Sequence, residues 1–335
     1  MTPDVKKNWR IAFILILSIF VVLLLSLNLG VMKITPMEVF QTFTGNGTPQ
    51  NNMVLYHFRL PRMVIALLIG AGMAVSGAIL QSVTQNDLAD PGIIGINAGA
   101  GFSVVLYIYF FQSSLLGASS LSIYLMPIAS LAGSAVAAAL IYVISWKNGI
   151  SPIRLILVGI GINSAFSALI MIFQYKMDPK DFTRATVWLS GNISGTDWSY
   201  VLTLLPWILI LIPVAIIKAR TLNSLNLGDD VAAGLGTHVE RERRILLFIA
   251  VALAGASVSV GGGIAFIGLV VPHLARKFAG ARHGGLLPVT ALLGALLLLV
   301  ADTIGRNILA PSEIPVGMVV SIVGGCYFIY LLMKS

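Results

Sequence analysis

Ten apolar stretches, each about long enough to cross a lipid bilayer, dominate the sequence. A helix needs about 20 mostly apolar residues to cross roughly 30 Å of hydrocarbon, and it must satisfy its backbone hydrogen bonds internally. We therefore expect an all-α polytopic membrane protein with about ten transmembrane helices in a single transmembrane domain, residues 1–335. The stretches are 11–30, 62–81, 93–111, 121–145, 152–174, 199–217, 244–261, 264–280, 286–303 and 314–333.

The division between the seventh and eighth stretches depends on three consecutive glycines. Without a break there, about 30 apolar residues would run together, which is too long for one span. Gly261, Gly262 and Gly263 make a tight turn inexpensive. At the N-terminus, Lys6, Lys7 and Arg10 precede an apolar run as in a secretory signal, but no small-residue cleavage site follows. We expect this run to be retained as the first span.

The charge content argues against a soluble enzyme. Only 10% of the residues are charged, whereas soluble domains carry about 25%. The net charge of +8 does not indicate a nucleic-acid partner, because lysines and arginines that flank membrane spans give the same sum. The composition therefore indicates a multi-pass protein of the cell membrane.

The distribution of basic residues predicts that both termini are cytoplasmic. With the N-terminus inside, 14 of the 21 lysines and arginines fall on the cytoplasmic side, and such an excess is typical of cytoplasmic loops. Two cytoplasmic termini require an even number of spans, in agreement with ten. The seven outer residues are Lys33, Arg59, Arg62, Lys176, Lys180, Arg184 and Arg306.

The sequence shows no energy source of its own. It contains no GxxxxGK[ST] loop for nucleotide phosphates, no HExxH motif and a single cysteine, Cys326. Almost every acidic residue falls in a loop. Only Asp302 lies inside an apolar stretch, where we expect it to pair with Arg306 one helical turn later. An ion-coupled carrier or an intramembrane enzyme is thus poorly supported, and we expect a partner to supply the energy.

The longest cytoplasmic segment, 218–244, contains a predicted helix-turn element. Asp229 or Asp230 is expected to cap a short helix, and Gly234 and Gly236 to end it. The segment also carries apolar side chains that a cytosolic loop need not expose. These side chains either enter a groove on a partner or pack against the protein's own helices, and the sequence alone leaves both alternatives open. They are Leu225, Leu227, Val231 and Leu235.

Several motifs in a fixed order, spread over residues 59–333, resemble one transporter family. The motifs are Arg59-Leu60-Pro61-Arg62 with 70–78, 86–96, Trp188-Leu189-Ser190-Gly191 with Trp198, 227–236, 263–276, Ala301-Asp302 with Arg306, and 313–317. Together they resemble the permease subunits of ABC importers for ferric siderophores, haem and vitamin B12, the FecCD-type permeases. One departure is Cys326, which stands where the family usually has a proline and so predicts a more regular last helix.

The resemblance implies an assembly as well as a fold. It implies ten helices per subunit, two permease subunits that are identical or paralogous, and two ATPase subunits that hydrolyse ATP with Mg²⁺. The chain itself would then bind no cofactor and catalyse no reaction. An extracytoplasmic substrate-binding protein, as a lipoprotein where no outer membrane exists, would deliver a ferric siderophore. Haem or vitamin B12 import by the same mechanism is the alternative.

The resemblance also assigns roles to particular residues. Arg59, Arg62 and Arg306 match the positions that meet acidic residues of the binding protein, an interaction that would set orientation and encounter rate and weaken with salt. Anchoring to lipid headgroups is the competing interpretation of these arginines. The cytoplasmic loop matches the coupling helices that sit in a cleft of the ATPase. Its expected coupling residues are Leu227, Gly228, Asp229, Gly234, Leu235 and Gly236.

Overall fold

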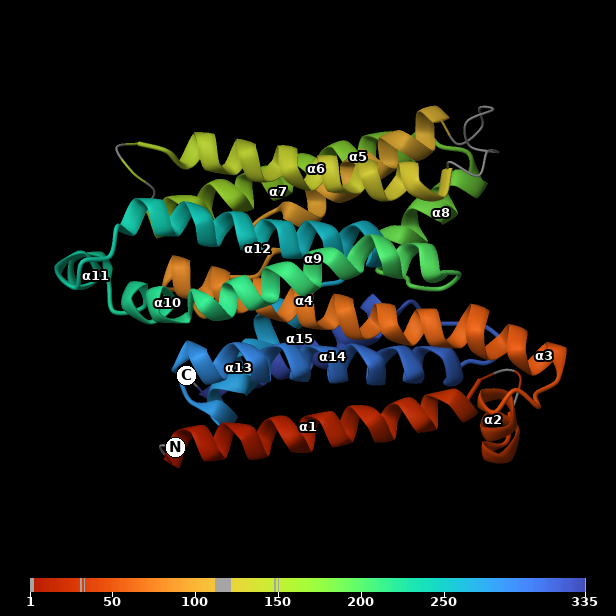
Figure 1. Cartoon of the computed structure of the whole chain (residues 1–335). Coiled ribbons are helices and arrows are strands. Elements are labelled where there is room, and N and C mark those ends of the chain that lie inside the picture. Colours follow the sequence, from red (N-terminus) through yellow and green to blue (C-terminus); the bar gives the residue numbers. More distant parts are fainter. Residues whose placement is uncertain are drawn as a thin grey trace.

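The computed structural model describes residues 3–30, 32, 34–111, 122–147, 149 and 151–334, and these are overwhelmingly helical (Figure 1). Two positions named in the sequence analysis lie outside the described residues: the outer lysine at 33 and the first residue, 121, of the fourth predicted span. The elements are α1 (Pro3–Asn28), α2 (Pro36–Phe43), α3 (Pro49–Asn52), the π-helix η1 (Met53–Arg59), α4 (Leu60–Thr84), α5 (Ile96–Phe111), α6 (Ser122–Ser145), α7 (Pro152–Tyr175), α8 (Pro179–Leu189), α9 (Trp198–Ile217), α10 (Ala219–Leu225), α11 (Asp229–Gly234), α12 (Val239–Gly261), α13 (Ile267–Ala279), α14 (His283–Asn307) and α15 (Val316–Lys334).

Each of the ten predicted spans corresponds to one of these helices. Within the described part of the chain, seven helical segments are long and apolar enough to cross a membrane. One of them is the continuous segment Pro49–Thr84, which comprises α3, η1 and α4. The other six are α1, α6, α7, α9, α12 and α14. The apolar helices α5 and α15 are shorter, and α13 is shorter still. The predicted break is confirmed, because α12 ends at Gly261 and Gly262 has a φ of +70°. Helix α15 continues through Cys326, as expected without a proline.

Helix α4 lies at the centre of the bundle and is packed through glycines. It contacts α9, α12, α13 and α14. A Cβ on Gly70 would lie 2.2 Å from the carbonyl oxygen of Gly294 on α14, and a Cβ on Gly77 would lie 2.0 Å from that of Gly268 on α13. Helices in lipid associate by such close packing, since no hydrophobic force drives them together. These glycines therefore set the separation between α4 and its neighbours.

We expect Gly77→Ala to destabilise the protein by about 3 kcal/mol, because the new methyl group must push two backbones apart. The matched control is Gly161→Ala on α7, where an added Cβ meets nothing within 4 Å. Thermal unfolding of the purified chain in mild detergent measures both variants. Equal stability of the two would contradict the proposed packing of α4 against α13.

The two ends of the bundle differ in the segments that they carry. Figure 1 shows both termini at the same end as α10 and α11, with α2, α3 and α8 at the opposite end. This arrangement agrees with the topology predicted from the basic residues, in which both termini and segment 218–244 share the cytoplasmic side. The end with α2, α3 and α8 is accordingly the outer end.

Candidate functional site

The cytoplasmic loop folds as two short helices that divide its apolar side chains between two environments. Leu225, at the end of α10, is buried in the protein's own core. Leu227 and Leu235 are 63% and 64% exposed, and Val231 on α11 is 50% exposed. Figure 1 shows α11 standing out beyond the neighbouring helices. The bundle therefore takes one of the four apolar residues and leaves three on the surface.

An ion pair joins α11 to the start of α12. The buried Arg243 donates through Nη2 to Oδ1 of Asp229 at 2.5 Å. The expected capping by Asp229 or Asp230 is wrong, since both lie inside α11 and the N-cap is Gly228, with a φ of +101°. The expected end is confirmed: α11 stops at Gly234 and is followed by Gly236 in a left-handed conformation. Asp229 thus holds the element to the bundle rather than closing its own helix.

A second set of hydrogen bonds ties α10 to the membrane-spanning helices. The side chain of Gln85, just after α4, donates to the carbonyl oxygen of Leu225 at 3.0 Å. Asn223 Oδ1 accepts from the backbone N–H of His283 at 2.9 Å and lies 2.7 Å from its Nδ1. The other ring nitrogen of His283 lies 2.6 Å from Ser82 Oγ. These hydrogen bonds connect α10 with the end of α4 and the start of α14, and sequence patterns gave no sign of this connection.

At the outer end, acidic and basic side chains form an ionic network that is buried except at Glu313. Asp302 is fully buried, and its Oδ1 lies 2.8 Å from Nε of Arg62. Its Oδ2 lies 3.3 Å from Nε of Arg306, which confirms the pair expected one turn apart. Arg62 Nη1 also meets Oε2 of Glu313 at 2.7 Å, and this oxygen accepts from the Ser194 hydroxyl. Burial opposes ionisation of Glu313, but these partners hold its pKa below the usual value.

The remaining arginine of the three predicted for docking is hydrogen-bonded to the end of α1. Arg59, at the end of η1, is buried and donates to the carbonyl oxygens of Leu27 and Met32. The last carbonyls of a helix lack partners within it, so the hydrogen bond to Leu27 satisfies one group that α1 leaves open. Arg306 likewise donates to the Ser26 hydroxyl. All three predicted docking arginines lie at the outer end with their guanidinium groups held inward, and their docking role stays a prediction.

Comparisons with known proteins agree with this geometry. The model of the FecCD transport family matches residues 16–334. The chain belongs to the FecCD transport family. It is 56% identical to the iron(3+)-hydroxamate import system permease protein FhuG of Bacillus subtilis, over the full length of both chains. It is 37% identical to the hemin transport system permease protein HmuU of Yersinia pestis, over 100% of this chain and 98% of that one.

A solved structure extends the agreement to three dimensions. An inward-facing metal-chelate type ABC transporter matches with a TM-score of 0.85 and 30% identity, over 97% of this chain and 99% of that chain. The FecCD chain is accordingly a multi-pass membrane permease. Its long apolar helices are suited to crossing the membrane. One end of the bundle carries the cytoplasmic loop and the other carries the ionic network around Asp302.

In this FecCD permease, three motifs that are far apart in sequence meet near the outer end. The N–H of Gly317, at the start of α15, donates to the carbonyl oxygen of Gly191 at 2.9 Å. The N–H of Gly263, in the turn before α13, donates to that of Trp188, at the end of α8, at 3.3 Å. The end of α8 is therefore hydrogen-bonded to the segments that begin α13 and α15. Displacement of α8 would pull on both.

Proposed function

We propose that this chain is the membrane-spanning subunit of an ATP-driven ABC importer that carries a ferric hydroxamate, a class of ferric siderophore, into the cytoplasm. The observation that carries the proposal is the 56% identity, over both full chains, to a ferric hydroxamate permease. Haem remains the alternative substrate, since the chain is also 37% identical to a hemin permease. No group of three or more His, Cys, Asp or Glu residues among those described could hold a metal ion. The iron therefore crosses as an intact chelate.

The proposed assembly assigns the energy source to other subunits. ATPase subunits bind the exposed apolar face of the cytoplasmic loop, formed by Leu227, Val231 and Leu235. A short helix with an apolar face that enters a groove is a common mode of recognition. These partners hydrolyse ATP with Mg²⁺, while a second permease subunit, identical or paralogous, completes the path. A substrate-binding lipoprotein delivers the chelate at the outer end.

Iron uptake by a deletion strain tests the proposed substrate. Cells that lack this chain, with and without a plasmid copy, receive radioactive iron as a ferric trihydroxamate, as haem or as ferric citrate. We expect only the trihydroxamate uptake to fall to background and to return with the plasmid. Retained trihydroxamate uptake together with lost haem uptake would overturn the substrate assignment and favour the haem alternative.

The docking role proposed for Arg59, Arg62 and Arg306 has a separate test. The affinity of the purified importer for its binding protein is measured at low and at high salt, and we expect it to fall about tenfold as salt screens the charges. Arg59→Gln should flatten this salt dependence, because one guanidinium is removed. Thermal unfolding of the variant controls for loss of the α1 contacts. A salt dependence identical to that of the unmodified protein would remove Arg59 from the docking surface.

A further inference from the structure

The outer segment between α1 and α4 exposes an apolar helix face that the bundle does not cover. On α2, Met37 and Phe40 are each 62% exposed and Phe43 is 48% exposed. Their three-residue spacing places them side by side on one face of the helix. Val39 and Thr42, on the opposite face, are buried against the protein. Helix α2 therefore packs one side against the protein and exposes an apolar face on the other side.

This apolar face is built on a well-defined helix. Thr35 caps α2 by accepting a hydrogen bond from the N–H of Glu38, and the Glu38 carboxylate accepts from the N–H of Thr35 at 2.7 Å. Pro36 occupies the first helical position, where its missing N–H costs nothing. Such a reciprocal capping box defines the start of a helix. The positions of Met37, Phe40 and Phe43 are thus set by regular helical geometry.

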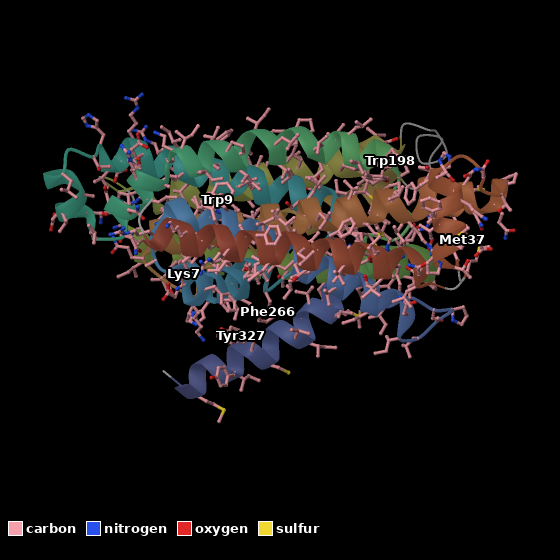
Figure 2. The ribbon with its side chains drawn as sticks, turned by 60° about the horizontal axis from the view of Figure 1, so that its bottom comes forward. Lys7, Trp9, Met37, Trp198, Phe266 and Tyr327 are labelled. Atoms are coloured by element: carbon pink, nitrogen blue, oxygen red, sulfur yellow. The ribbon has the colours of Figure 1, made fainter. Side chains whose placement is uncertain are left out.

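The orientation of α2 differs from that of the spanning helices. Figure 1 shows α2 running across the direction of α1 and α4, at the outer end of the bundle. Since the long helices cross the bilayer, a helix that lies across them lies in the plane of the membrane. Figure 2 shows Met37 at the same end as Trp198. An amphipathic helix in this plane has the geometry of an interfacial helix.

The surface around α2 is of the kind that meets lipid. Most of α1 is exposed, since only 11% of the residues in its apolar stretch are buried. Leu25 and Leu29 extend this exposed surface to the end of the helix next to α2. Aromatic side chains gather at the same level. The Phe43 ring lies edge-on to Tyr56, and the Trp198 indole donates to the carbonyl oxygen of Tyr56 at 2.7 Å. Tyrosine and tryptophan concentrate where a membrane meets water.

We propose that α2 is an interfacial anchor, with Met37, Phe40 and Phe43 inserted between acyl chains and headgroups of the outer leaflet. The continuity of its apolar face with the lipid-facing surface of α1 identifies the bilayer as the occupant. The same segment leads through η1 to Arg59, which caps α1. The anchor thus holds the outer corner formed by α1 and α4 at a fixed depth. This inference stands independently of the transported substrate.

The test uses the full chain with Cys326→Ser, which removes the single native cysteine. One new cysteine is introduced as Phe40→Cys, or as Phe43→Cys should the first variant fold poorly. The matched control is Gln41→Cys, an exposed polar position on the same helix. Each is labelled with a small fluorophore and reconstituted into vesicles of phosphatidylglycerol and phosphatidylethanolamine. Quenching is measured with a lipid that carries a nitroxide near its headgroup and with aqueous iodide.

We expect the nitroxide lipid to quench the label at position 40 about threefold more strongly than the label at position 41, with the order reversed for iodide. Strong iodide quenching and weak lipid quenching at position 40 would place α2 in water and overturn the proposal. Protection from both quenchers, in the chain alone or in the assembled importer, would show that a protein surface covers α2. That result would also overturn it.

Discussion

Asp302→Ala is expected to destabilise the protein by about 3–5 kcal/mol, because it leaves two buried arginines without their shared carboxylate. Asp302 is fully buried, and Arg62 and Arg306 both approach it within 3.3 Å. Thermal unfolding in mild detergent measures the loss. The stability of Asp302→Asn should fall between that of the unmodified protein and that of Asp302→Ala, since the amide oxygen can keep one hydrogen bond but the charge is lost.

A surface ion pair provides the control for this substitution. Asp181 lies 3.8 Å from Arg184 on α8, and the Arg184 side chain is 46% exposed. Asp181→Ala should therefore cost no more than about 1 kcal/mol. If Asp302→Ala were as stable as Asp181→Ala, the outer network would have no structural importance. The arginines would then be held by other contacts.

Leu227→Glu combined with Leu235→Glu is expected to weaken binding of the ATPase subunits at least about tenfold, with little change in thermal stability. Both leucines are largely exposed, so the core loses nothing, whereas burial of two carboxylates in an apolar groove is costly. Co-purification with the ATPase and ATP hydrolysis by the mixture measure the effect.

Leu309→Glu is the matched control, because Leu309 is 60% exposed in the loop that follows α14 at the outer end. The control should retain the ATPase in normal amount. Normal ATPase binding by the double variant would exclude the exposed face of the cytoplasmic loop as the contact. Loss of binding by both proteins would point to a general effect of the added charge.

The sequence allowed accurate prediction of features that depend on neighbouring residues. Each spanning helix was expected because an apolar run of sufficient length has few alternatives in lipid. The pair of Asp302 with Arg306 was expected because residues four apart face each other on a helix. The partner Arg62 was missed, since it lies 240 positions from Asp302 and only the packing of α4 against α14 joins them.

The cytoplasmic loop shows the same limit at a smaller scale. The end of its short helix α11 was predicted from Gly234 and Gly236, but the preceding helix α10 was not predicted, and Asp229 pairs with Arg243 instead of capping α11. Asp229 pairs with Arg243 because a buried guanidinium needs a carboxylate partner, and the sequence does not show that Arg243 is buried. The different environments of Leu225 and Leu227 likewise depend on which side of α10 meets the bundle.

The outer arginines illustrate how a side of the membrane can be predicted while a conformation cannot. The excess of cytoplasmic basic residues placed Arg59, Arg62 and Arg306 outside, and the structure has them at the outer end. Their inward orientation depends on acceptors from other segments, including Leu27 and Asp302. Basic residues near a membrane surface are equally compatible with solvent, lipid or buried partners until the fold is known.

Transport by the reconstituted importer tests the central claim most directly. The chain, its partner permease and the ATPase are placed in vesicles, with the binding protein and a radioactive ferric trihydroxamate on the side of the vesicle membrane opposite the ATPase. We predict uptake only when ATP is supplied on the ATPase side and the binding protein is present, and no uptake with an inactive ATPase. Uptake by the chain alone, driven by a proton or sodium gradient without ATP, would contradict the account and establish an ion-coupled carrier.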